Sequence, residues 1–309
     1  MLFRSPMNTL EKLLLAEGYQ QFISQDEVLS AILAPQPNTI QLDPPGETMR
    51  LDFTRTLERL TARLQQRAPG APPIFAYSQP QNIHVSVIQR EGAKALDAGS
   101  YAGFYAPYAS RLKRMDHAFG KFLDSLKAAG LYDDSIIILT ADHGDSLGED
   151  GRWGHAYTIF PEVVRIPLLI HLPKWLRQGV TFDEKRLAFT TDLSPTLYYL
   201  LGHSPTLHSP LVGSPLFSNS DDKDAGRETG RYLITSSYAP VYGMLSRNGT
   251  EFYISDAVNF KDYLFDLRAE TPHERPFGDA TRQQQRDFIR ESINAINQLY
   301  RFNSDAGTK

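Results

Sequence analysis

The sequence contains no cysteine among its 309 residues. Disulfide bonds and thiolate-liganded metal sites are therefore excluded, and any bound metal must be held by His, Asp or Glu side chains. The redox compartment stays open, because a protein without cysteine tolerates both oxidising and reducing surroundings.

Long apolar runs and basic clusters are also absent. The longest apolar runs, such as residues 166–173, are far shorter than a membrane-spanning helix, and the first 19 residues lack the order of a signal peptide. The formal net charge is −4 with both signs interspersed, so nucleic acid is not expected as a partner. The hydrophobic content of 41% is enough for a substantial core.

The first part of the chain predicts helices before strands. Residues 8–18 form a helix between an N-cap at Asn8 and a C-cap at Gly18, and no strand precedes it, so we expect the N-terminal part of a parallel sheet to be missing from this chain. A Pro-rich loop is predicted at residues 37–47, an amphipathic helix between 48 and 73, and a buried strand at 74–79.

The middle of the chain alternates helix and strand. Apolar spacing predicts a helix at residues 108–130 that leads directly into a strand at 135–140, then a strand within 163–173 and a helix within 190–202. We therefore expect a parallel α/β core over residues 1–217.

After residue 217 the pattern changes. A polar linker rich in Ser, Asp and Gly leads into short strands, with a hairpin turn at Asn248-Gly249, and residues 282–300 predict a terminal amphipathic helix. We expect residues 218–309 to form a C-terminal subdomain with a small antiparallel sheet plus a helix.

Side chains typical of metal ligands follow the strand that ends near residue 140. Asp142 and His143 lie at the expected carboxyl end of a strand, the edge of a parallel sheet at which loops converge and ligands bind. A carboxylate with an imidazole suits Zn²⁺ or Mn²⁺ better than Ca²⁺. The glycine-rich stretch that follows permits a tight excursion back to His155, which is either a further ligand or a donor to the substrate.

Each of these residues also has an ordinary structural interpretation. An Asp after a strand is commonly a turn residue, and a single His is more often structural than a ligand. His84 is intermediate, because it follows a buried strand at the same expected edge of the sheet. We assign no functional role to the remaining histidines, His117, His171, His203, His208 and His273.

The motif and its surroundings together resemble a known family. Residues 140–173, which contain Asp142, His143 and His155, resemble the metal-binding signature of the sulfatase branch of the alkaline phosphatase superfamily. Similarity to that family extends over roughly residues 8–274, through the segments 108–144, 190–202, 242–255 and 262–274. The resemblance implies an alkaline phosphatase-like α/β fold: a central, mostly parallel sheet flanked by helices, with a small C-terminal antiparallel sheet.

The resemblance also implies roles for individual residues. Asp142 and His143 would bind a divalent metal, Mn²⁺, Zn²⁺ or Ca²⁺. His155 would contact the charged ester and its leaving group. His84 falls where the family often has a His for substrate contact or leaving-group protonation, although its surrounding phrase departs from the family's. Arg165 matches a recurrent basic residue with a structural role.

The family's nucleophile has no counterpart in this sequence. It is a Cys or Ser in a Cys/Ser-x-Pro-x-Arg phrase, or an unmodified Ser or Thr in the phosphotransferring branches, and it precedes the helix that here begins at Asn8. The five Ser-Pro pairs of this chain lack the Arg four residues on. We therefore expect a fragment that carries half of the site and is weak or inactive alone.

Three functional interpretations remain open. The first is a metal-dependent sulfatase-like hydrolase of small-molecule or glycan sulfate or phosphate esters. The second is a phosphoethanolamine-type phosphotransferase, which the spacing between Asp142 and His155 resembles and which would be anchored to a membrane only by a missing N-terminal segment. The third is a non-catalytic relic or binding module. The family resemblance suggests the bacterial periplasm or the outer face of the membrane.

Overall fold

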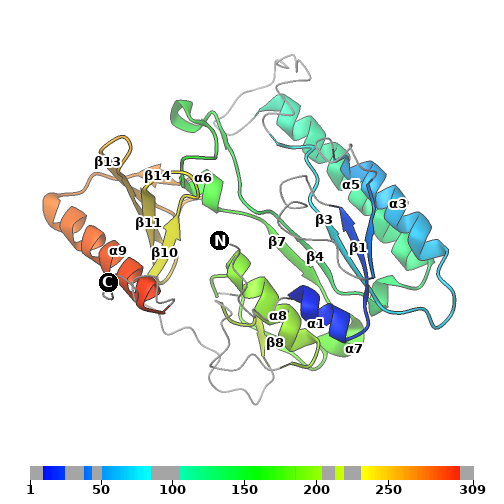
Figure 1. Ribbon diagram of the computed structural model, residues 1–309. Helices are drawn as coiled ribbons and strands as arrows, with labels where there is room; N and C mark the ends of the chain where they lie inside the picture. Colours follow the sequence, from blue (N-terminus) through cyan, green and yellow to red (C-terminus); the bar gives the residue numbers. More distant parts are fainter. Residues whose placement is uncertain are drawn as a thin grey trace, which may run out of the picture. The chain divides into compact units, whose positions relative to one another are not determined.

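The computed structural model describes residues 10–24, 38–43, 51–84, 105–184, 186–203, 213–218 and 231–299 (Figure 1). By internal contacts the chain divides into two compact units. Unit one contains residues 1–138, 169–184 and 188–225, and unit two contains 139–168, 185–187 and 226–309. Each unit consists of several separate segments of the sequence, so this division does not test a single boundary at residue 217. The boundary stays a prediction.

Unit one contains a parallel three-stranded sheet in the order β2 (Thr39–Gln41), β1 (Gln20–Ser24), β3 (Ile74–Ser78). Two amphipathic helices, α3 (Phe53–Gln65) and α5 (Ala106–Ala128), run side by side next to this sheet (Figure 1). Their apolar faces close a core that contains Phe22, Leu60 and Phe122. Burial of these faces, more than helix propensity, holds the two helices in place.

Two of the sheet's strands were not predicted. β2 lies inside the stretch that we expected to be a Pro-rich loop, so that expectation is wrong for residues 39–41. β1 was overlooked because only Phe22 and Ile23 of its five residues are apolar. Its Gln21 and Ser24 are nonetheless buried, which pattern reading does not anticipate for polar side chains.

The predicted helix-to-strand step in the middle of the chain is confirmed. α5 ends before Gly130, whose φ is +70°, and the 3-10 turn η2 (Tyr132–Asp134) then leads into β4 (Ile137–Thr140). β4 pairs with β7 (Leu168–His171). The predicted helix near residue 193 is α8 (Leu193–Leu200).

Buried Asp192 precedes α8 and ties its start to other segments. Its carboxylate accepts hydrogen bonds from the backbone N–H groups of Phe189 and Ser214. Unit one also contains the short elements α1 (Leu10–Ala16), α7 (Lys174–Arg177), β8 (Thr181–Phe182), η4 (Thr190–Asp192) and β9 (Phe217–Ser218).

Unit two contains an antiparallel sheet in the order β10 to β14 and the long helix α9 (Asp279–Leu299) (Figure 1). Ile289 of α9 packs with one set of buried sheet side chains, and Ile159 and Phe160 pack with another. The predicted hairpin turn at Asn248-Gly249 is present, with φ +68° at Gly249. The strands β10 to β14 are Arg231–Thr235, Val241–Ser246, Glu251–Asp256, Lys261–Asp266 and His273–Glu274.

The predicted fold class is confirmed: parallel strands with flanking helices are followed by a C-terminal antiparallel sheet with its helix. Within the described ranges, no helix combines the length and the apolar character that crossing a membrane requires.

Candidate metal and ester-binding site

The candidate site begins where β4 ends. Asp142 Oδ1 accepts the backbone N–H of His143 at 3.0 Å, and its other oxygen, Oδ2, lies 3.7 Å from His143 Nε2. The side chains of Asp142 and His143 are 63% and 37% exposed, so both are accessible to a ligand from solvent. The carboxylate and the imidazole therefore face one another at an open position.

His143 is oriented by its own loop. Its Nδ1 lies 2.9 Å from the carbonyl oxygen of Gly144, an acceptor-only group, so Nδ1 carries the hydrogen. In a neutral ring the lone pair is then on Nε2, the nitrogen that faces Asp142. Hydrogen bonding to a backbone carbonyl through the second nitrogen is the usual arrangement of a metal-binding histidine.

A short hairpin brings His155 back to His143. Strands β5 (Ser146–Leu147) and β6 (Trp153–Gly154) pair antiparallel, and the 3-10 turn η3 (Glu149–Gly151) connects them. The glycines in the connection have positive φ, +113° at Gly148 and +78° at Gly151, which residues with a Cβ rarely adopt, and Gly154 of β6 has a φ of +79°. This is the tight excursion that the glycine spacing predicted.

Asp145 pairs with His155, a contact that the sequence did not predict. Its Oδ1 accepts a hydrogen bond from His155 Nδ1 at 2.6 Å, and the side chains are only 9% and 20% exposed. The rings of His143 and His155 lie 3.9 Å apart. Ligand atoms of His143, Asp145 and His155 all lie within 4.8 Å of one another. The pairing of Asp145 with His155 follows from the register of the hairpin, and the residue types alone do not specify that register.

The hairpin is fastened to helix α6 (Pro161–Val164) through Glu162. One carboxylate oxygen of Glu162 accepts hydrogen bonds from Ser146 Oγ at 2.7 Å and from Arg152 Nε at 2.9 Å. Burial lowers the pKa of Arg152, but the hydrogen bond and charge of Glu162 outweigh it, so the pKa lies above its usual value. The Arg152 guanidinium also lies 4.2 Å from the ring of Phe160. These contacts restrict the motion of the loop that carries His155.

Gly144 makes a close backbone contact between the site loop and α6. Its N–H donates to the carbonyl of Val163 at 2.7 Å, and a Cβ at this position would lie 2.2 Å from the carbonyl oxygen of Glu162. Only glycine fits without a backbone shift. The residue directly after His143 is therefore positioned by backbone contact.

His84, the other predicted catalytic residue, belongs to unit one, whereas His143 and His155 belong to unit two. It follows β3, is half-buried, and donates its backbone N–H to the carbonyl of Gln81 at 3.2 Å. Arg165 caps α6 through its backbone N–H and is exposed, in keeping with a structural position.

The remaining described histidines lie outside this cluster. His171 stacks on Tyr132 and contacts its carbonyl, and His203 lies 3.1 Å from a carboxylate oxygen of Glu17. His117 and His273 are exposed, on α5 and β14. His208 lies outside the described residues.

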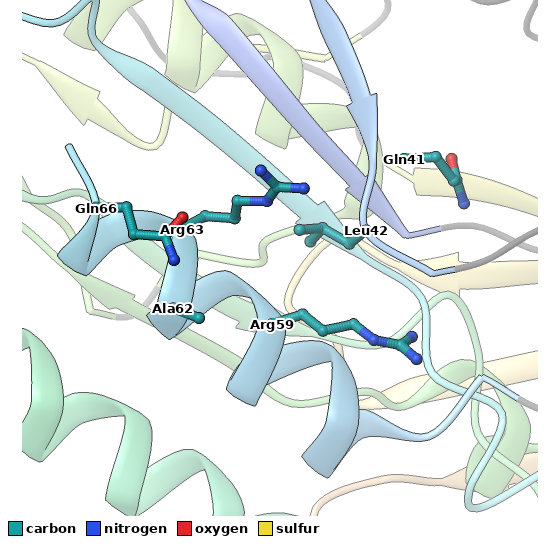
Figure 2. Close-up of a pocket in the computed structure, with 6 residues that line it drawn as sticks. All are labelled: Gln41, Leu42, Arg59, Ala62, Arg63 and Gln66. Atoms are coloured by element: carbon teal, nitrogen blue, oxygen red, sulfur yellow. The ribbon is translucent and has the colours of Figure 1, made fainter.

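A separate cavity of about 430 Å³ lies in unit one, against α3 and β2 (Figure 2). Two arginines line this cavity, but they do not form a simple anion-binding site, because Arg59 is paired with the buried carboxylate of Asp43 at 2.5 Å. None of its lining residues is a His, Asp or Glu, so it offers no metal ligands. The lining residues are Gln41, Leu42, Arg59, Ala62, Arg63 and Gln66.

Comparison with known proteins identifies the family. The family model described as Sulfatase matches residues 4–203. The chain belongs to the sulfatase family. Solved structures of sulfatases and of a member of the alkaline phosphatase superfamily from Vibrio parahaemolyticus share its fold; the latter has 19% identity and a TM-score of 0.54, covering 93% of this chain and 68% of that chain. The predicted membership of the sulfatase branch is thereby confirmed.

Several curated sulfatases are similar over part of this sulfatase-family chain. Choline-sulfatase of Rhizobium meliloti is 28% identical over 167 residues, 53% of this chain and 31% of the relative. N-acetylglucosamine-6-O-sulfatase of Bacteroides thetaiotaomicron is 31% identical over 109 residues, 35% of this chain and 19% of the relative. The matches span about a third or less of the first curated relatives' length.

Two solved structures cover most of the sulfatase-family chain. One, in complex with its substrate D-glucosamine-2-N,6-O-disulfate, has 15% identity and a TM-score of 0.55, with 99% of this chain and 85% of that chain covered. A phosphonate monoester hydrolase from Silicibacter pomeroyi has 17% identity and a TM-score of 0.51, with 92% and 67% covered. At these identities the similarity establishes the fold alone.

Proposed function

We propose that this chain contributes the metal- and ester-binding part of a hydrolase that acts on sulfate esters, with phosphate esters as the second candidate class. The observation that carries the proposal is the pair of histidine rings 3.9 Å apart, each with a carboxylate beside it. Charged and hydrogen-bonding groups of this kind stabilise the anionic centre of an ester during substitution.

Asp142 and His143 would hold the metal. Two ligand atoms bound to one ion at distances near 2.1 Å lie no more than about 4.2 Å apart. The separation of 3.7 Å between Asp142 Oδ2 and His143 Nε2 satisfies this limit, and the Nδ1 hydrogen bond of His143 leaves Nε2 for the ion. A nitrogen and oxygen donor set favours Zn²⁺ or Mn²⁺ over Ca²⁺. When bound, the metal would supply positive charge that polarises the ester.

His155 would contact the ester or its leaving oxygen. Its ring lies against His143, so an ester held at the metal position is within reach of the same pair of rings. His84 stays a proposed second contact to the substrate. The sequence contains no Cys and no Ser-x-Pro-x-Arg phrase, so the proposal assigns the nucleophile to none of its residues.

Exposed aromatic rings favour a sugar as the alcohol part of the substrate. Trp153 and Tyr157 flank His155 in sequence and are 57% and 66% exposed, and Tyr238, 73% exposed, lies edge-on to Tyr157 with ring centroids 6.1 Å apart. Amphipathic aromatic rings offer both an apolar face and a polar group to a ligand. Relatives whose names specify sulfated sugars, such as N-acetylglucosamine-6-O-sulfatase, support the same substrate class.

Metal binding tests the proposal directly. Isothermal titration of the purified chain with Zn²⁺ should show one site, and Asp142→Asn or His143→Ala should weaken it at least tenfold because each removes a ligand. His117→Gln, a change at an exposed helical histidine in unit one, is the matched control and should leave the affinity unchanged. Equal Zn²⁺ affinity in all four proteins would refute the assignment of the metal site.

A further inference from the structure

The carboxylate of Asp145 is largely buried and lies beside the ring of His155. It is 9% exposed, and the hydrogen bond that the structure gives it comes from His155 Nδ1 at 2.6 Å. Removing a carboxylate from water is costly unless a hydrogen-bonded partner compensates. The hairpin register that pairs Ser146 with Gly154 holds the two side chains together.

A carboxylate acts on a histidine in a defined way. It accepts only from a nitrogen that carries hydrogen, so it selects the ring form with hydrogen on Nδ1 and fixes the orientation of the ring. In this protein the consequence is that any contact between His155 and an ester is made through Nε2. The ring also lies against that of His143, with centroids 3.9 Å apart and an angle of 33° between the ring planes.

We propose that Asp145 is the positioning residue of His155: it fixes the Nδ1–H form and the orientation of the ring, so that Nε2 is presented to the bound ester. The inference rests on the proposed function of the site. It assigns Asp145 a role that requires no direct contact with substrate or metal.

A metal ligand would be the alternative role for Asp145, since His143, Asp145 and His155 lie close enough to share an ion. The geometry argues against it. Two atoms that bind one ion at about 2.1 Å with tetrahedral angles are roughly 3.4 Å apart. The 2.6 Å between Asp145 Oδ1 and His155 Nδ1 is instead the distance of a charge-assisted hydrogen bond.

Nitrogen-15 NMR of the histidine-labelled chain tests the pairing itself. The His155 signals are assigned by their loss in His155→Gln. We expect the Nδ1–H form in the unchanged protein and a mixture of ring forms in Asp145→Asn, because an amide can donate or accept. Asp150→Asn, an exposed acid in the same hairpin, is the control and should leave the His155 signals unchanged. Identical His155 signals in Asp145→Asn would overturn the proposal.

Titration separates positioning from metal binding. Asp145→Asn should bind Zn²⁺ within threefold of the unchanged chain, whereas its affinity for inorganic sulfate in the Zn²⁺-loaded state should fall about tenfold. His155→Gln should lose a similar factor and the double variant no more, because Asp145 acts through His155. A loss of Zn²⁺ affinity as large as in Asp142→Asn, or additive losses of sulfate affinity, would overturn the proposal.

A second variant covers the case in which Asp145→Asn fails to fold. Asp145→Glu keeps the carboxylate, so it should retain the Nδ1–H form of His155; a mixture of ring forms in a folded Asp145→Glu protein would count against the proposal. If the unchanged chain binds no Zn²⁺ or sulfate, the proposed function fails, and the NMR result alone decides whether Asp145 positions His155.

Discussion

Gly144→Ala should loosen the site without changing any of its functional side chains. The new Cβ would lie 2.2 Å from the carbonyl oxygen of Glu162 and 3.3 Å from its carbonyl carbon, so the loop or α6 must shift. The shift would break the hydrogen bond from Gly144 N–H to Val163, worth about 1 kcal/mol, and overpacking costs typically 1–3 kcal/mol. We expect the free energy of unfolding of unit two to fall by about 2–4 kcal/mol.

Urea denaturation followed by tryptophan fluorescence and circular dichroism measures this loss, and Zn²⁺ titration measures its effect on the adjacent His143. The matched control is Gly120→Ala, in which the same methyl group is added to an exposed position of α5 with open space around it. There we expect a gain of up to about 1 kcal/mol from helix propensity. A Gly144→Ala protein with an unchanged denaturation midpoint and unchanged Zn²⁺ affinity would refute the reasoning about close backbone contact.

Three further predictions concern the support of the site, the pH dependence of stability and the catalytic activity of the chain. Glu162→Ala should destabilise unit two by about 2–3 kcal/mol in urea denaturation, because it leaves Arg152 and Ser146 without their shared acceptor; Glu270→Ala, at an exposed acid, should change little. Burial raises the pKa of Tyr253 to about 12. The stability that the neutral Tyr253 contributes is therefore complete below pH 10 and is lost as the pH rises from 10 to 12. Tyr253→Phe should reduce this alkaline loss in thermal unfolding, and an unchanged pH profile would contradict the prediction. The purified 309-residue chain should not measurably hydrolyse 4-nitrophenyl sulfate; robust hydrolysis that is lost in His143→Ala would show this expectation to be wrong.

Sequence reasoning succeeded where local periodicity and end signals agree. The helix that we predicted at residues 108–130 is observed as α5 and ends before Gly130, and the strand that follows is β4. It failed at β1 and β2, where short strands gain their stability from parallel neighbours and helices instead of from their own pattern. Strands of three to five residues with polar members carry too little periodic signal to be recognised alone.

The site was predictable only in part for a related reason. Asp142, His143 and His155 stand out because their residue types and spacing suggest a ligand set. Asp145 does not, since its role depends on which residue of a hairpin lies opposite His155, and hairpin register is set by turn geometry. Glu162 is equally inconspicuous in sequence, although it accepts hydrogen bonds from both Ser146 and Arg152.

The C-terminal sheet helps to support the site through Phe160. This residue is the N-cap of α6, and its ring lies edge-on to Tyr263 and Phe265 of β13, with centroids 5.1 and 6.0 Å away. The same ring contacts the guanidinium of Arg152 from the site hairpin. Because aromatic cores are densely packed and transmit displacement, a change in the sheet core at Phe265 would reach the hairpin that carries His155. The antiparallel sheet therefore helps to fix the position of the site hairpin, even though none of its own side chains belongs to the candidate ligand set.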